Sequence, residues 1–135
     1  MREIDKTCRA LIENLLDVIL ILDNDASIVW INPAVGRYGL QPQDAIGHRA
    51  LEHVHPEDTE RVREALAEAL GNPGKPVVLA GIRIIPVGSR IFHFDLPLTY
   101  LPDTPGINGT VVVAHDITDR VRAEEPLLKS EEKYR

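Results

Sequence analysis

The stretch Thr110–Arg122, with the sequence Thr-Val-Val-Val-Ala-His-Asp-Ile-Thr-Asp-Arg-Val-Arg, decides the fold of this chain. Its first half, Thr110–Ala114, is apolar and β-branched, which predicts a strand inside a sheet rather than at its edge. Asp116 and Thr118 follow, and either side chain can accept a hydrogen bond from the free backbone N–H groups of a helix start. The stretch therefore predicts a hinge between a central strand and an outgoing helix.

The composition fits one compact domain with a short tail. The chain has 135 residues, of which 44% are hydrophobic, enough for a single core. Its formal net charge of −6 argues against nucleic acid and anionic membranes as partners. Cys8 is the one cysteine, which excludes an internal disulfide and favours a cytoplasmic protein. No signal peptide is recognisable, and the apolar run Leu11–Leu22 is too short and too interrupted for direct membrane insertion.

The first 16 residues predict an amphipathic helix. Apolar side chains recur there at three- and four-residue steps and form one stripe: Ile4, Cys8, Leu11, Ile12 and Leu15. Two interpretations stay open, because such a stripe can pack on its own domain or form the seam of a homodimer.

A β-hairpin should follow. Val18–Leu22 and Ser27–Ile31 are the predicted strands, and the turn formers Asp23–Ala26 join them. Asn32 and Pro33 end the second strand, with Asn32 as the cap of the next helix.

Several helices, then three strands, complete the pattern. The predicted helical segments are Pro33–Tyr38, Pro42–Ala45, Ala50–Val54 and a longer helix that begins near Pro56 and ends near Leu70. The predicted strands are Val77–Ile85, with both faces covered, Arg90–Tyr100, with alternating faces, and Thr110–His115. This order predicts an α+β fold with an antiparallel sheet and helices on one face.

Residues 118–135 predict a charged connector helix. Ile117, Val121 and Leu128 give it a thin apolar stripe, and Pro126 should kink or end it. The segment cannot bury much surface by itself, so we expect it to lead to a further domain.

Taken together, these pieces resemble the PAS sensor domain family of bacterial and archaeal signalling proteins. The resemblance rests on the order and spacing of the opening hairpin, Asn32-Pro33-Ala34, Ile46-Gly47, His55-Pro56-Glu57-Asp58, the long helix, three returning strands and Asp116-Ile117-Thr118. It implies a five-stranded antiparallel sheet that encloses a small-molecule pocket with its helices, and a PAS domain over residues 17–117. Ser130–Arg135 looks like the first helix of another such domain. Ala26 departs from the family pattern, which usually has glycine there.

The resemblance also assigns candidate site residues. Signal transfer falls on Asp116, Ile117 and Thr118. The candidate pocket residues are Asn32, Tyr38, Val54, Leu66, Ile82, Phe94 and Val112. The cofactor is left unidentified. A covalent flavin photocycle is excluded because no cysteine follows the first hairpin, and the absence of histidine from Thr59–Leu70 argues against haem.

A cluster of histidine and acidic side chains offers a possible metal site. His48, His53 and His55 with Glu57 and Asp58 could bind a metal, but a polar loop before a helix start is favoured. No phosphate-binding loop, dinucleotide fingerprint or nucleophile elbow is present.

The sequence therefore predicts a non-catalytic sensory or relay domain of a multidomain signalling protein, such as a histidine kinase or a cyclic-dinucleotide enzyme. It would bind a small ligand, form a homodimer, or both, and act on downstream domains of the same chain. The alternative is a dimerisation and spacing module without a ligand.

Overall fold

The structure, a computed structural model, describes residues 17–88 and 90–123. Within them one antiparallel sheet has five strands in the order β2-β1-β5-β4-β3. The strands are β1 (Val18–Leu22), β2 (Ile28–Ile31), β3 (Val77–Ile84), β4 (Phe92–Leu101) and β5 (Gly109–Asp116). The predicted helix over residues 1–16, the connector beyond residue 123 with Pro126, and Ser130–Arg135 lie outside the described residues.

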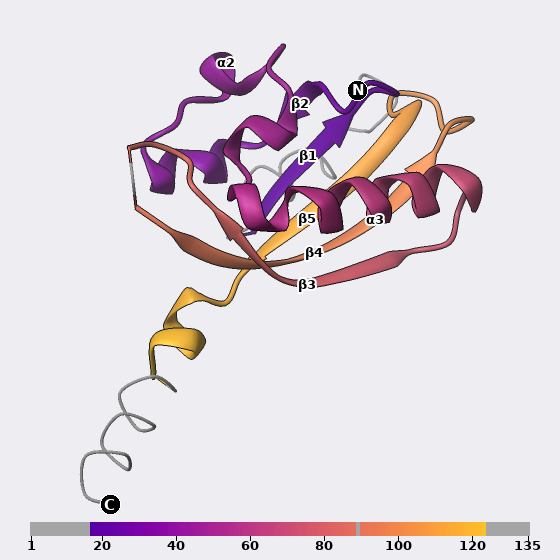
Figure 1. Cartoon of the computed structure of the whole chain (residues 1–135). Coiled ribbons are helices and arrows are strands. Elements are labelled where there is room, and N and C mark those ends of the chain that lie inside the picture. Colours follow the sequence, from indigo (N-terminus) through magenta and orange to yellow (C-terminus); the bar gives the residue numbers. More distant parts are fainter. Residues whose placement is uncertain (1–16, 89, 124–135) are drawn as a thin grey trace, which may run out of the picture.

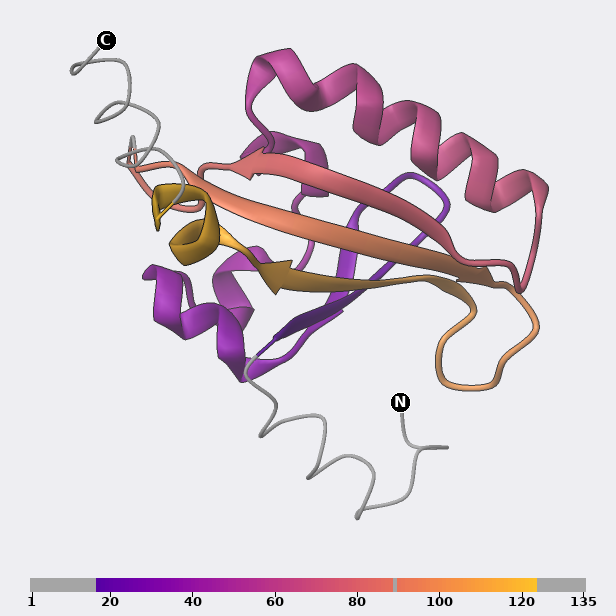
Figure 2. The ribbon, with the colours of Figure 1, turned by 90° about the horizontal axis from the view of Figure 1, so that it is seen from below.

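In the described part of the chain, five helices lie between β2 and β3 and gather on one face of the sheet, as Figures 1 and 2 show. They are η1 (Pro33–Tyr38), α2 (Pro42–Ala45), η2 (Ala50–His53), η3 (Pro56–Asp58) and α3 (Thr59–Gly71). The longest, α3, buries Val62, Ala65 and Ala69 against the sheet and keeps its charged residues in water. The predicted α+β architecture is confirmed.

β5 is the central strand, as its β-branched sequence predicts. It pairs with β1 on one side and β4 on the other, so that Val112 stands opposite both Leu20 and Leu98. After Asp116 the chain becomes helical over residues 118–123, and Figure 1 shows this turn leaving the body of the domain. The predicted passage from a central strand into a helix is therefore present.

The turn between β1 and β2 explains the departure at Ala26. Ala26 adopts a left-handed backbone with φ 62°, a region that costs an L-residue about 1–2 kcal/mol and glycine nothing. The Asp23 carboxylate holds this turn by accepting hydrogen bonds from the backbone N–H groups of Asp25 and Ser27, both at 2.9 Å. Ser27 itself forms an isolated bridge with Arg49, so β2 begins one residue later than predicted.

The prediction that both faces of β3 are covered is wrong. β3 lies at the edge of the sheet, and 73% of Val78 is exposed. A bulge at Ala80 and Gly81 interrupts its pairing with β4, and the Arg61 guanidinium donates to the backbone oxygen of Ala80 at 2.6 Å. Apolar residues on both alternate sets do not require two covered faces, because an antiparallel sheet can leave one of its faces in water.

Candidate functional site

A cavity of about 120 Å³ lies between the helices and the inner face of the sheet. Alternate residues of β1 and β5 form part of its floor, because side chains on a strand point to one face at every second position. Of the seven predicted pocket residues, five line this cavity: Tyr38, Val54, Leu66, Phe94 and Val112.

Asn32 and Ile82 do not line the cavity. Asn32 is completely buried, but its side chain accepts a hydrogen bond from the N–H of Ile19 at 3.0 Å and donates one to the carbonyl of Asp17 at 3.0 Å. It therefore fixes the start of β1, and it makes no side-chain cap to η1 although it occupies the cap position. Ile82, also fully buried, packs within the hydrophobic core instead.

The cavity wall is almost entirely apolar, and its two polar members are Tyr38 and His53. The sequence indicates His53 only as a possible metal ligand. Its place in the wall could not be read from the sequence, because it depends on the antiparallel bridge between Val54 and Ile84 that brings η2 against β3.

Tyr38 connects the cavity to the exit from β5. Its ring meets Phe92 and Phe94 edge to face, with centroids 4.8 and 5.4 Å apart, an arrangement that aromatic pairs prefer. Its hydroxyl donates a hydrogen bond to Oδ2 of Asp116 at 2.7 Å. Burial and the neighbouring Asp116 raise the pKa of Tyr38 well above its ordinary value, so the hydroxyl stays a donor at neutral pH.

Asp116 uses its second oxygen to start the outgoing helix. Oδ1 accepts a hydrogen bond from the N–H of Thr118 at 2.7 Å, which satisfies one of the free donors of a helix start. Burial opposes ionisation of Asp116, but hydrogen bonds from Thr118 and Tyr38 outweigh it and hold the pKa of this carboxyl below its usual range. The ionised carboxylate therefore joins the cavity wall to the helix.

Ile117 and Thr118 attach the exit to β4. Both are buried, with 6% and 4% of their surface exposed. The N–H of Ile117 donates to the carbonyl of His93 at 2.8 Å, and the N–H of His93 donates to Oγ1 of Thr118 at 2.8 Å. Thr118 thus holds the neighbouring strand, while Asp116 alone of the two predicted caps accepts from the helix start.

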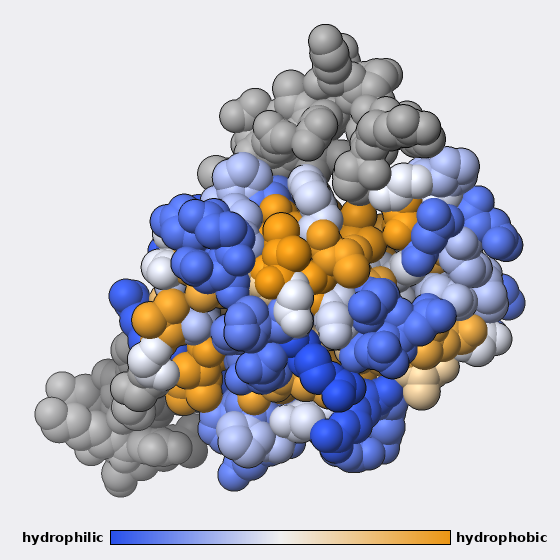
Figure 3. Space-filling model, turned by 90° about the horizontal axis from the view of Figure 1, so that it is seen from above, coloured by the Kyte–Doolittle hydropathy of each residue, from blue (hydrophilic) through white to orange (hydrophobic). Residues whose placement is uncertain are grey.

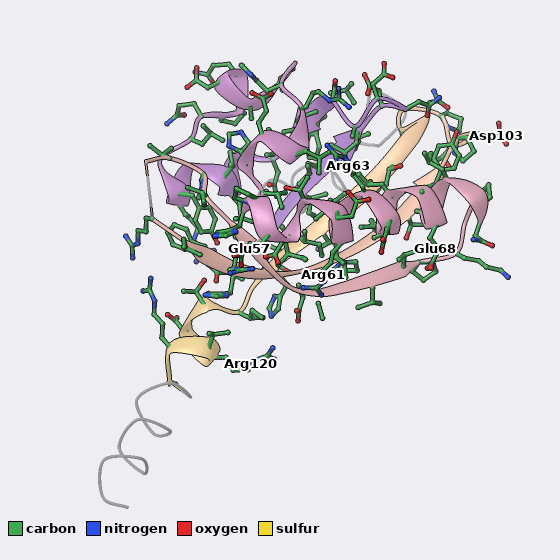
Figure 4. The ribbon with its side chains drawn as sticks, viewed as in Figure 1. Glu57, Arg61, Arg63, Glu68, Asp103 and Arg120 are labelled. Atoms are coloured by element: carbon green, nitrogen blue, oxygen red, sulfur yellow. The ribbon has the colours of Figure 1, made fainter. Side chains whose placement is uncertain are left out.

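A second charged cluster supports the fold beside α3. Asp58 is buried and accepts hydrogen bonds from the backbone N–H and the Nε of Arg83, at 2.8 and 2.9 Å. The Arg83 guanidinium lowers the pKa of Asp58 to about 2 against the cost of burial. Glu57 and Arg61 flank this pair at the start of α3 (Figure 4), and the cluster ties η3 to the edge strand β3.

The remaining histidines make separate contacts. His48 faces Glu52 at 3.5 Å, and Nδ1 of His55 accepts from the N–H of Glu57. His115 is exposed beside Asp17, and neither it nor His93 lines the cavity. Across residues 17–88 and 90–123, no group of three or more histidine, cysteine or acidic side chains is placed to hold a metal.

The PAS fold family matches residues 12–122 of the chain. The chain belongs to this family. PAS domains are sensory and signalling modules and generally lack catalytic activity. No curated protein matches the chain at a significant level. Among the helices of the described residues, none has the length and apolar character needed to cross a bilayer.

Solved PAS domains share the fold at low sequence identity. The PAS domain of a protein from Colwellia psychrerythraea is 20% identical, with a TM-score of 0.72 over 84% of this chain and 97% of that chain. The PAS domain of an HTR-like protein from Haloarcula marismortui is also 20% identical, with a TM-score of 0.71 over 82% of this chain and 89% of that one. The Drosophila melanogaster Cycle PAS-B domain, solved with bound ethylene glycol, is 17% identical, with a TM-score of 0.61 over 73% of this chain and 96% of that chain.

Proposed function

We propose that this PAS domain binds a small ligand in its cavity and transmits the occupancy of that cavity to the helix after β5. The observation that carries the proposal is the shared position of Tyr38. Its ring lines the cavity, and its hydroxyl bonds to the carboxylate that caps the outgoing helix. A ligand that displaces this ring therefore acts on the helix start through one side chain.

The energy available is sufficient for a switch. A hydrogen bond to an ionised group contributes about 1.5–3 kcal/mol, and a difference of about 1.4 kcal/mol changes an equilibrium tenfold. The helix has two states, one with the bond between Tyr38 and Asp116 formed and one with it broken. A ligand that binds one of these states more tightly than the other shifts the equilibrium between them. The attachments of Ile117 and Thr118 to His93 pass the same change to β4.

The test combines ligand retention with hydrogen exchange. Native mass spectrometry of the freshly purified chain should detect a retained small molecule, and removing it should change amide exchange over residues 117–123. Asp116→Ala should keep the fold by circular dichroism but abolish this ligand-dependent change. Asp103→Ala is the matched control, because Asp103 lies in the loop between β4 and β5 at the other end of the sheet (Figure 4). Ligand-dependent exchange that persists in Asp116→Ala would contradict the proposal.

Homodimerisation is a second candidate function, and apolar side chains away from the cavity favour it. Ile19, Val111 and Val113 are half-buried and alternate with cavity-lining residues, so they lie on the sheet face opposite the cavity. Val29 on edge strand β2 and Ile46 after α2 are 48% and 44% exposed. Figure 3, which looks from above onto the part of the molecule with α2 and β2, shows a patch of apolar side chains there. Sedimentation of a monomer at high concentration would count against a dimer.

The cysteine content and the charged C-terminal segment bear on the cellular location and the parent protein of this domain. We propose that it works in the cytoplasm as part of a longer signalling chain, such as a histidine kinase or a diguanylate cyclase, with residues 118–135 as the connector to the output domain. The lone cysteine and the charged segment after Thr118 support this setting.

A further inference from the structure

The size and lining of the cavity restrict the ligand that it can hold. Its volume is about 120 Å³, somewhat below the roughly 150 Å³ of an engineered apolar cavity that binds benzene. Among the described residues, no buried side-chain nitrogen or oxygen lacks a hydrogen-bond partner. The deep part of the cavity therefore offers no polar group to a ligand and fits a single apolar ring.

The polar groups of the wall lie at one end of the cavity. Tyr38 and His53 are half-buried, as are Ile84 and Pro86 beside them, whereas floor residues such as Val112 are buried. Strand register places Ile84 opposite Phe92, at the end of the sheet where β5 also finishes. The two polar wall residues thus lie at the end of the cavity from which the outgoing helix departs.

His53 is the side chain that can bind a polar group of a ligand. No hydrogen bond or ion pair of the described residues engages its imidazole, which can donate through one nitrogen and accept through the other. The Tyr38 hydroxyl already donates to Asp116, so only its oxygen remains as an acceptor. A ligand hydroxyl, which both donates and accepts, complements this pair.

The charges at this end do not select an anion. The Asp116 carboxylate accepts a hydrogen bond from Tyr38, so a negative charge stands at the polar end. The guanidinium of Arg37 lies over the Tyr38 ring, 5.7 Å from its centroid, and has partners of its own. Charges of both signs over an apolar floor favour a neutral molecule, since burying an unpaired ion is costly.

We propose that the cavity binds a neutral, ring-sized molecule with one hydroxyl group, such as a phenol or a cyclohexanol, whose hydroxyl bonds to His53. The proposal rests on the proposed function of the cavity and names the chemical class of its ligand. The ring of the ligand occupies the apolar floor. Its hydroxyl lies beside Tyr38, which bonds to Asp116 at the end of β5.

The test compares phenol with toluene, which has nearly the same shape but no hydroxyl, in the whole chain by titration calorimetry. His53→Phe keeps a planar ring and removes both nitrogens. It should weaken phenol binding about five- to tenfold, the effect of one hydrogen bond, and leave toluene binding within about twofold. His48→Phe is the matched control, because 58% of the His48 side chain is exposed and His48 does not line the cavity. Benzoate should bind more weakly than phenol.

The outcomes separate this proposal from the function on which it rests. Equal losses for phenol and toluene in His53→Phe, or no loss for phenol, would overturn the hydroxyl assignment while the cavity remains a ligand site. The same holds if benzoate binds more tightly than phenol, or if the purified chain retains a molecule of another class and neither probe binds. A chain that binds no probe and retains no molecule would overturn both.

Discussion

Replacing Tyr38 with phenylalanine tests the link between the cavity and the exit helix. The substitution removes one oxygen and keeps the ring that packs on Phe92 and Phe94. The lost interaction is the 2.7 Å hydrogen bond from the hydroxyl to the carboxylate of Asp116. We expect Tyr38→Phe to fold normally and to be less stable, with the loss concentrated at the start of the outgoing helix.

The magnitude follows from the partner and its burial. A hydrogen bond to an ionised acceptor contributes about 1.5–3 kcal/mol, and water screens part of this because both residues are only half-buried. We therefore expect the free energy of unfolding to fall by about 1–2 kcal/mol. For a domain of this size, that corresponds to a decrease in Tm of roughly 4–8 °C.

Thermal and urea denaturation, followed by circular dichroism, measure this change, and Tyr100→Phe supplies the control. Tyr100 is also half-buried on the sheet, but no described interaction engages its hydroxyl. Its replacement should change the free energy of unfolding by less than about 0.5 kcal/mol. Equal effects of the two substitutions would refute the assigned role of the bond between Tyr38 and Asp116.

The same substitution should change the acid limb of the stability profile. The folded-state pKa of Asp116 lies below its unfolded value, partly because of Tyr38. The ionised carboxylate therefore contributes stability above the unfolded pKa of about 3.9, and this stability is lost as the pH falls through the folded-state pKa. In Tyr38→Phe the pKa of folded Asp116 should lie closer to its unfolded value. The free energy of unfolding of this variant should therefore fall less than that of the wild type when the pH is lowered from neutral to acid.

Three further substitutions test other parts of the fold. Ala26→Gly should stabilise the domain by about 0.5–1 kcal/mol because the backbone φ of Ala26 is 62°. The control Ala67→Gly, on the exposed face of α3, should instead destabilise it by about 1 kcal/mol. Urea denaturation measures the sign of both changes. Gly109→Ala should cost about 1–3 kcal/mol, since its Cβ would overlap a backbone oxygen of β1, while Gly71→Ala meets nothing and should be neutral or stabilising by the same assay. Asp58→Asn should lower the free energy of unfolding by about 2–3 kcal/mol at pH 7 and flatten its decline as the pH falls from about 4 towards 2, measured by denaturation across that range; an unchanged pH slope would argue against the ionised pair.

Local pattern was sufficient where neighbours in the chain decide the conformation. The β-branched run of β5, the alternation of β4 and the proline and glycine signals around η1 predicted these elements to within a residue or two, whereas α3 begins three residues after the predicted start because Pro56–Asp58 form the separate helix η3. The short polar side chain of Asp116, two residues before Thr118, likewise predicted a helix start. Such features depend on backbone preferences and hydrogen bonds that span only a few residues.

The tertiary structure decided what depends on distant partners. The sequence does not show which face of the sheet stays in water, so the expectation that both faces of β3 are covered is wrong. It placed Asn32 and Ile82 in the pocket and missed His53, because the inward direction of each side chain depends on strand register and on how η2 meets β3. The bond between Tyr38 and Asp116 joins residues 78 positions apart, and only the closed sheet brings them together. Periodicity predicts which elements form, but the packing of those elements decides which side chains meet, and the proposed function of this domain depends on the latter.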